Sequence, residues 1–165
     1  MYIWIIMYVI HSESGSEIRV AISKLDTKEI ALINKSKRFD FNWNKEKQYD
    51  VYKLNAEGVD EPLGLMSLAD RPADFAIEIR LLASSLENVS KTKQYQRIAG
   101  CLIAFACRKA FEAGYGGYVC LKPKTELKNH YQDVYGFVST KLFLVTHGHN
   151  SSSLINKYYE KRDEQ

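Results

Sequence analysis

The chain has 165 residues, 45% of them hydrophobic and 26% charged, and a net charge of +3. This length and composition predict one globular domain, 1–165, whose core needs neither disulfides nor metals for stability. Basic and acidic residues are mixed along the chain, with no basic run of five, which argues against a nucleic-acid partner. Three cysteines without C-x-x-C spacing are predicted to be core residues in a reducing compartment.

The first segment, Met1 to Ile10, has aromatic and β-branched residues in both of its alternating sets. This pattern predicts a strand that is covered on both faces. The segment is too short for a membrane span, which needs about 20 apolar residues, and it lacks the start and cleavage site of a signal peptide. We therefore expect a cytoplasmic protein with no membrane partner. A homodimer formed through this strand is an alternative that the sequence leaves open.

The next two regions differ in periodicity. Apolar residues between Ile18 and Ile33, with Asp26-Thr27 as a helix start, predict one or two short helices. Phe39 to Trp43 alternates with period two, and Tyr49 to Leu54 is strand-like. Because a polar turn separates these last two segments, we expect them to form a hairpin.

Two further strands are predicted at Leu63 to Ala69 and at Phe75 to Leu82, on either side of a turn that contains Pro72. Strict alternation divides the second strand into two faces. One face has Phe75, Ile77, Ile79 and Leu81, and the other has Ala76, Glu78, Arg80 and Leu82.

A long apolar helix is predicted from Ile98 to Ala113, with Gly114 at its end. Its first half is apolar nearly all round, so it must be buried on more than one side. The short strand at Tyr118 to Leu121 should lie parallel to the strand at Phe75 to Leu82, through a right-handed crossover.

Three elements complete the chain: a helix at Thr125 to Tyr135 that Gly136 ends, a strand at Phe137 to Thr146, and a helix at Ser152 to Glu160. The whole order predicts an α/β (α+β) fold, with a mixed sheet and helices on both of its faces.

The start of the long helix is a predicted anion site. A polar loop precedes it, and a helix N-terminus offers unpaired backbone N–H groups and the positive end of a dipole. Together these favour a phosphate. Lys91, Lys93 and Arg97 surround the same point. They either contact a phosphate or form a solvated basic patch.

Two short patterns carry a family resemblance. The first is Gln94, Arg97 and Ala99, and the second is Tyr131 followed by Gly136-Phe137. In this order they resemble the GNAT superfamily of N-acetyltransferases. Its acetyl-CoA loop reads Q/R-x-x-G-x-G/A, and its later signature reads F-Y-x-x-x-G-F. Arg97 stands at the usual glycine, where it either crowds the pyrophosphate or binds it as a cation.

The resemblance covers Phe39 to Thr146 by order of elements and is most specific from Gln94 to Phe137. The run Tyr95 to Ile103 resembles a small subgroup of uncharacterised bacterial members. The resemblance implies a mostly antiparallel central sheet and direct transfer of acetyl from acetyl-CoA to a primary amine of a small molecule or protein. The alternative is a catalytically degenerate member that binds CoA or a protein partner.

The family holds the pyrophosphate with backbone N–H groups of its loop and pairs the pantetheine arm with the strand before it. By resemblance, the cofactor-binding residues are Leu82, Ala83, Gln94, Tyr95, Gln96, Arg97, Ile98, Ala99, Gly100 and Lys124. Lys124 replaces an asparagine that is usual after the following strand, and this departure favours the degenerate alternative.

The family chemistry also needs an acid and a base. Tyr131 is the candidate acid for the departing thiolate, since a tyrosine with a pKa of about 10 is protonated at neutral pH. Strict alignment places Gln132 on the family tyrosine, so Tyr131 either acts with a helix end shifted by one residue or only packs. Glu78 is the candidate base, or else an ion-pair partner of Arg80 or a solvent-facing charge. No metal site is expected, because His147-Gly148-His149 lacks further ligands nearby.

Overall fold

The computed structural model describes residues 2–89, 93–123 and 125–164. Its strands form one sheet in the order β10-β1-β2-β3-β4-β5-β7-β9-β8, with β6 paired to β1. Only β5 and β7 are parallel neighbours among the described strands, so the predicted mixed, mostly antiparallel sheet is confirmed. The strands are β1 (Tyr2–His11), β2 (Glu17–Lys24), β3 (Asp50–Ala56), β4 (Gly64–Arg71), β5 (Ala76–Ser84), β6 (Tyr95–Gln96), β7 (Val119–Leu121), β8 (Val138–Ser139), β9 (Leu144–Thr146) and β10 (Tyr159–Glu164).

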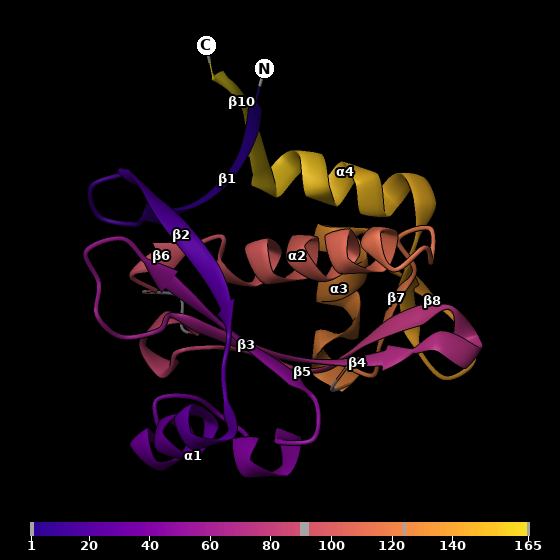
Figure 1. The fold of residues 1–165 in the computed structure, drawn as a ribbon, viewed down its shortest axis with the longest axis horizontal. Helices are drawn as coiled ribbons and strands as arrows, with labels where there is room; N and C mark the ends of the chain where they lie inside the picture. The colour runs from indigo at the N-terminus through magenta and orange to yellow at the C-terminus, as the bar shows by residue number, and fades with distance from the viewer. Residues whose placement is uncertain (1, 90–92, 124, 165) are drawn as a thin grey trace.

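Helices cover both faces of this sheet, as predicted. Figure 1 shows α2 against one face, α4 stacked on the outer side of α2, and α1 on the opposite face. None of the described helices is long and apolar enough to cross a membrane. The helices are α1 (Thr27–Ser36), α2 (Ile98–Glu112), α3 (Lys128–Tyr135) and α4 (Gly148–Tyr158), with short 3₁₀ helices η1 (Trp43–Glu46), η2 (Pro72–Asp74), η3 (Leu86–Asn88) and η4 (Thr125–Leu127).

The helix α2 lies at the centre of the larger core, as its apolar sequence predicts. Its residues from Cys101 to Ala104 have no exposed surface. At Gly100 an added methyl group would overlap the ring of Tyr158, so glycine allows α4 to approach α2 closely. All three cysteines are buried and unpaired, as predicted for core residues.

A β-bulge divides β5. The register with β4 shifts between Ser67 and Leu68, which makes Arg80 the extra residue of β5. Leu82 therefore packs with the core around α2, while Leu81 and Ala83 face the core around α1. The alternation predicted for this strand is wrong beyond Ile79, because a bulge reverses the faces that follow it.

Two predictions near the N-terminus are also wrong. Residues 17–24 form β2 instead of helix, because Ile18, Val20 and Ile22 alternate and pack on the larger core. The segment from Phe39 to Trp43 is a loop that leads into η1, and the expected hairpin is replaced by the pairs β2–β3 and β3–β4. There the Trp43 N–H donates to the Asn34 side chain, which leaves it no ladder bond.

The C-terminal region differs in detail from its prediction. Residues 137–146 form the hairpin β8–β9 instead of one strand, and the Thr140 N–H donates to the Phe143 carbonyl within its turn. The predicted helix before it begins as η4 and continues as α3. After α4 the chain adds β10, which pairs antiparallel with β1 and brings the two termini side by side (Figure 1).

Candidate functional site

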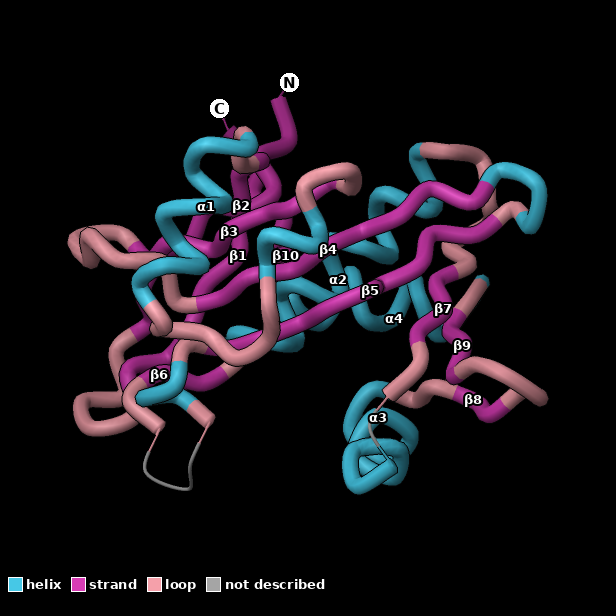
Figure 2. Tube along the Cα trace, turned by 90° about the horizontal axis from the view of Figure 1, so that it is seen from below, coloured by secondary structure: helices cyan, strands magenta, loops and turns pink. Residues whose placement is uncertain are grey.

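The sheet opens between β5 and β7. These strands pair only where Ile77–Ile79 lies beside Val119–Leu121. Beyond that point β5 continues to Ser84, while the chain after β7 turns away towards α3, as Figure 2 shows. In the described chain the edge of β5 from residue 80 to 84 has no strand neighbour on this side. Such an edge offers backbone N–H and C=O groups to an extended ligand.

Hydrogen-bond alternation identifies the residues that face the opening. The Ser85 N–H donates to the Leu63 carbonyl next to β4, which fixes the phase of the ladder. Backbone groups of successive strand residues point to opposite sides. Those of Ala83 therefore point to Leu65 on β4, and those of Leu82 and Ser84 point to the opening. Of the two residues expected to pair with a pantetheine arm, Leu82 has the required direction and Ala83 does not.

Two adjoining cavities occupy the opening. Cavity I is lined by Asp40, Phe41, Ile79, Arg80, Leu81, Leu82, Ala83, Ser84, Val89, Leu121, Lys122, Pro123, Leu127 and Tyr131. Cavity II is lined by Leu82, Ser84, Asn88, Val89, Lys93, Tyr95, Arg97, Ile98, Ala99, Leu127, His130, Tyr131 and Tyr135. The two cavities share the side chains around Leu82 and Tyr131, so one ligand can extend from the start of α2 into cavity I.

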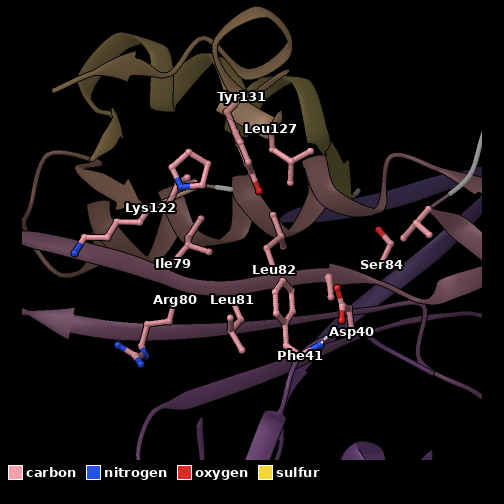
Figure 3. Close-up of a pocket in the computed structure, with 14 residues that line it drawn as sticks. Asp40, Phe41, Ile79, Arg80, Leu81, Leu82, Ser84, Lys122, Leu127 and Tyr131 are labelled. Atoms are coloured by element: carbon pink, nitrogen blue, oxygen red, sulfur yellow. Dashed lines mark hydrogen bonds between the residues drawn. The ribbon is translucent and has the colours of Figure 1, made fainter. Parts of the chain in front are cut away.

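Tyr131 lies where the cavities join. Figure 3 shows it reaching from α3 towards β5, with its hydroxyl pointing towards Leu82. Burial raises the pKa of the Tyr131 hydroxyl, so the group stays protonated across the neutral range. Its ring packs against Phe137 and Tyr135, which fixes its direction. Gln132, which strict alignment places on the family tyrosine, lines neither cavity.

The first turn of α2 forms one end of cavity II. No side chain caps this helix, and the Cys101 N–H makes the first helical bond to the Arg97 carbonyl. The N–H groups of Ile98, Ala99 and Gly100 thus have no partner within the helix. Lys93 also lines the cavity. The predicted contributions of Lys91 and Lys124 lie outside the described residues.

The loop before α2 is held by backbone pairing. Tyr95 and Gln96 form β6 against the end of β1. The Tyr95 N–H donates to the Asn88 side chain at 2.9 Å, and the Gln94 carbonyl accepts from the Ser12 N–H at 2.8 Å. These bonds fix the path of the loop. Of the residues predicted there, Tyr95, Arg97, Ile98 and Ala99 line cavity II, whereas Gln94, Gln96 and Gly100 line neither cavity.

Arg97 has a left-handed backbone, with a φ of 83°. A residue with a side chain adopts this conformation at a cost of about 1–2 kcal/mol, whereas glycine adopts it readily. This explains a preference for glycine at this position. The guanidinium is turned towards β1 and α4, where it donates to the carbonyls of Tyr8 and Lys157. Arg97 also lines cavity II, so it lies beside the start of the helix with its guanidinium held by these two carbonyls.

The predicted base, Glu78, is separate from both cavities. Its carboxylate accepts from Arg71 at 3.1 Å, and its side chain is 15% exposed. Arg80, the alternative partner, instead pairs with Glu46 at 2.9 Å. Glu78 thus forms an ion pair, as the alternative to a catalytic role expected, but its partner is Arg71 and not Arg80.

Several cavity residues were not predicted from the sequence. Lys122 and Arg80 lie at one end of cavity I, and Asp40 and Ser84 lie at the other (Figure 3). Asp40 belongs to the segment that was mistaken for a strand. The end of the strand at Lys122-Pro123 was a usable signal, because ligand-binding side chains often follow strand ends. The remaining residues had no local sequence signal.

The sequence matches no family model and no curated protein. Solved structures, however, share the fold. A mutant AtaT toxin bound to the C-terminus of the antitoxin AtaR is 14% identical, with a TM-score of 0.56 over 84% of this chain and 98% of that one. A protein described as a GNAT-family acetyltransferase from Desulfovibrio desulfuricans is 9% identical, with a TM-score of 0.54 over 78% and 98%.

A third solved structure contains a ligand. It is the PaiA N-acetyltransferase from Thermoplasma acidophilum in complex with coenzyme A, 13% identical, with a TM-score of 0.54 over 78% of this chain and 98% of that chain. At these identities the likeness shows the fold alone. The chain therefore has the GNAT fold, as the resemblance of its short motifs predicted.

Proposed function

We propose, on the premise of the GNAT fold, that this chain transfers an acetyl group from acetyl-CoA to a primary amine of a small molecule or protein. One observation carries the proposal: an open strand edge lies between an uncapped helix N-terminus and the partly buried Tyr131. This combination suits a ligand with phosphates at one end, an extended amide arm, and a thioester.

The residues present fit acetyl-CoA. The pyrophosphate would be held by the N–H groups of Ile98, Ala99 and Gly100, with charge from Lys93. The pantetheine arm would pair with Leu82 and Ser84. The thioester would then lie near Tyr131, where the cavities join, and cavity I would admit the acceptor.

In the proposed reaction the amine nitrogen attacks the thioester carbon, a C–N bond forms and the C–S bond breaks. Tyr131 donates its hydroxyl proton to the departing sulfur and then takes up a proton from solvent. The amine proton leaves to water or to Asp40, a carboxylate that lines cavity I. We assign no proton transfer to Glu78, because it is bonded to Arg71 outside both cavities.

A titration followed by a turnover assay tests this proposal. Calorimetry with acetyl-CoA should show binding, and thiol release should then be followed with amino acids, peptides, aminoglycosides and aminoacyl-tRNA. The last class is included because another AtaT structure contains acetyl-methionyl-tRNA. Binding without turnover across the panel would support the degenerate CoA-binding alternative, and absence of binding would overturn the cofactor site.

A reducing, cytoplasmic location also belongs to the proposal. It is supported by three buried cysteines without disulfides. Pairing of two copies through β1 is a separate hypothesis, and sedimentation of the purified protein would test it.

A further inference from the structure

The most unusual backbone position next to the site is Arg97, directly before α2. It is one of four non-glycine residues with positive φ in the described chain, and it is the residue from which α2 starts. Since no side chain caps the helix, the direction of its first N–H groups depends on how this residue is held.

Four contacts hold Arg97. Its Nε donates to the Tyr8 carbonyl at 3.1 Å, and its Nη2 donates to the Lys157 carbonyl at 3.3 Å. The guanidinium carbon also lies 4.1 Å from the ring centre of Tyr8 and 4.8 Å from that of Tyr158. The planar group thus lies against one tyrosine ring from β1 and one from α4, and it donates to one backbone carbonyl of each of these two elements.

We propose that Arg97 is a positioning residue for the phosphates of the cofactor. Its clamp between Tyr8 and Tyr158 fixes the left-handed turn that aims the first N–H groups of α2 into cavity II. This inference rests on the proposed function, and it makes β1 and the C-terminal helix α4 part of the cofactor site.

Two other roles for Arg97 make different predictions. An arginine that contacts phosphate directly would act through its charge, so loss of Tyr158 would leave CoA affinity unchanged or raise it. An arginine that obstructs the site would allow tighter binding when removed. A clamp instead requires both the guanidinium and the rings.

The test measures the affinity of the full chain for CoA and for pantetheine, which has the same thiol arm without phosphates. The variants are Arg97→Gly, which accepts the left-handed turn but removes the clamp, and Tyr158→Leu, which keeps the charge. Tyr158→Phe keeps the ring. Arg108→Ala is the matched control, because Arg108 lies on the same helix and stacks on Tyr159, away from the loop.

We expect Arg97→Gly and Tyr158→Leu each to weaken CoA binding about tenfold by loss of preorganisation, with pantetheine affinity unchanged. Tyr158→Phe and Arg108→Ala should retain wild-type affinity for both ligands. Equal losses for CoA and pantetheine, or unchanged CoA affinity in the first two variants, would overturn the inference alone. Failure of the wild type to bind CoA would overturn the proposed function as well.

Discussion

The strand β5 has a closed half and an open half, and the β-bulge at Arg80 separates them. In the closed half, residues 77–79 are bonded on both sides, between β4 and β7. In the open half, residues 80–84 have β4 as their only strand neighbour among the described strands. One strand thus supplies rigidity at one end and, within the described part of the chain, backbone groups without a strand neighbour at the other. Mutations in the closed half should change stability, and those around the open half should change binding and turnover.

The largest expected effect is on turnover. Tyr131→Phe removes the proposed acid and keeps the ring, so kcat should fall by a factor on the order of 10²–10⁴ while the KM for acetyl-CoA changes little. Thiol release measured across the pH range checks this. Gln132→Ala, at the position that strict alignment favours, is the control and should retain full activity. Unchanged turnover of Tyr131→Phe at every pH would remove the acid from the mechanism.

A mutation that leaves a void in the closed half should lower stability and leave CoA binding unchanged. Ile77 of β5 is buried in the larger core, together with residues of α2. Ile77→Ala should lower the free energy of unfolding by about 2–5 kcal/mol, from lost burial and a residual cavity. Urea denaturation measures this loss, and calorimetry on the folded variant should give wild-type CoA affinity. If the affinity falls with the stability, the two halves of β5 are not independent.

Alkaline pH should lower the stability of the elements next to the closed half, because α2 has two buried thiols and β7 has one. Burial raises the pKa of Cys101 and Cys107 to about 12, and that of Cys120 to about 11. Because the unfolded chain loses these protons near pH 8.5, stability is fully present below that pH. The free energy of unfolding should fall by about 1.4 kcal/mol per thiol and pH unit until the folded-state pKa is reached.

Urea midpoints measured between pH 8 and 11 test this slope. Cys120→Ala, on β7, should remove the contribution of one thiol to the pH dependence, so that stability declines less steeply with pH. A flat profile for the wild type over this range would mean that the thiols are accessible to solvent in the folded state.

The smallest effect is expected at the outer end of cavity II. Lys93→Gln removes a solvent-exposed charge near the predicted pyrophosphate position and should weaken CoA binding about two- to fivefold, with a larger factor at low salt. Titrations at two salt concentrations check this. Lys28→Gln on α1 is the control for total charge. Equal effects of the two variants would mean that Lys93 makes no local contact.

The sequence was sufficient where burial decides structure. The helix α2 and its parallel strands β5 and β7 follow from an all-round apolar segment between two short apolar runs, and the crossover rule sets their direction. The loop from Gln94 to Gly100 leads into α2, and Tyr131 follows β7. The positions of these elements therefore also place the loop and Tyr131 at the expected site. Long apolar patterns are informative because few arrangements bury them.

The sequence was insufficient where a single residue changes the geometry. Nothing in the alternation of β5 marks Arg80 as an extra residue, so the predicted faces of Leu81 and Leu82 are wrong. The loop that brings Asp40 and Phe41 to cavity I was predicted as a strand because its period of two is real. There the Asn34 side chain binds the backbone in place of a neighbouring strand.

The central claim is that a CoA arm completes the open half of β5, and amide hydrogen exchange followed by NMR tests it most directly. Without ligand, the Leu82 and Ser84 amides should exchange much faster than Ala83, whose backbone faces β4. With CoA bound, exchange at Leu82 or Ser84 should slow markedly while Ala83 stays unchanged. If CoA binds and both amides keep their ligand-free rates, the opening between β5 and β7 is not where its arm lies.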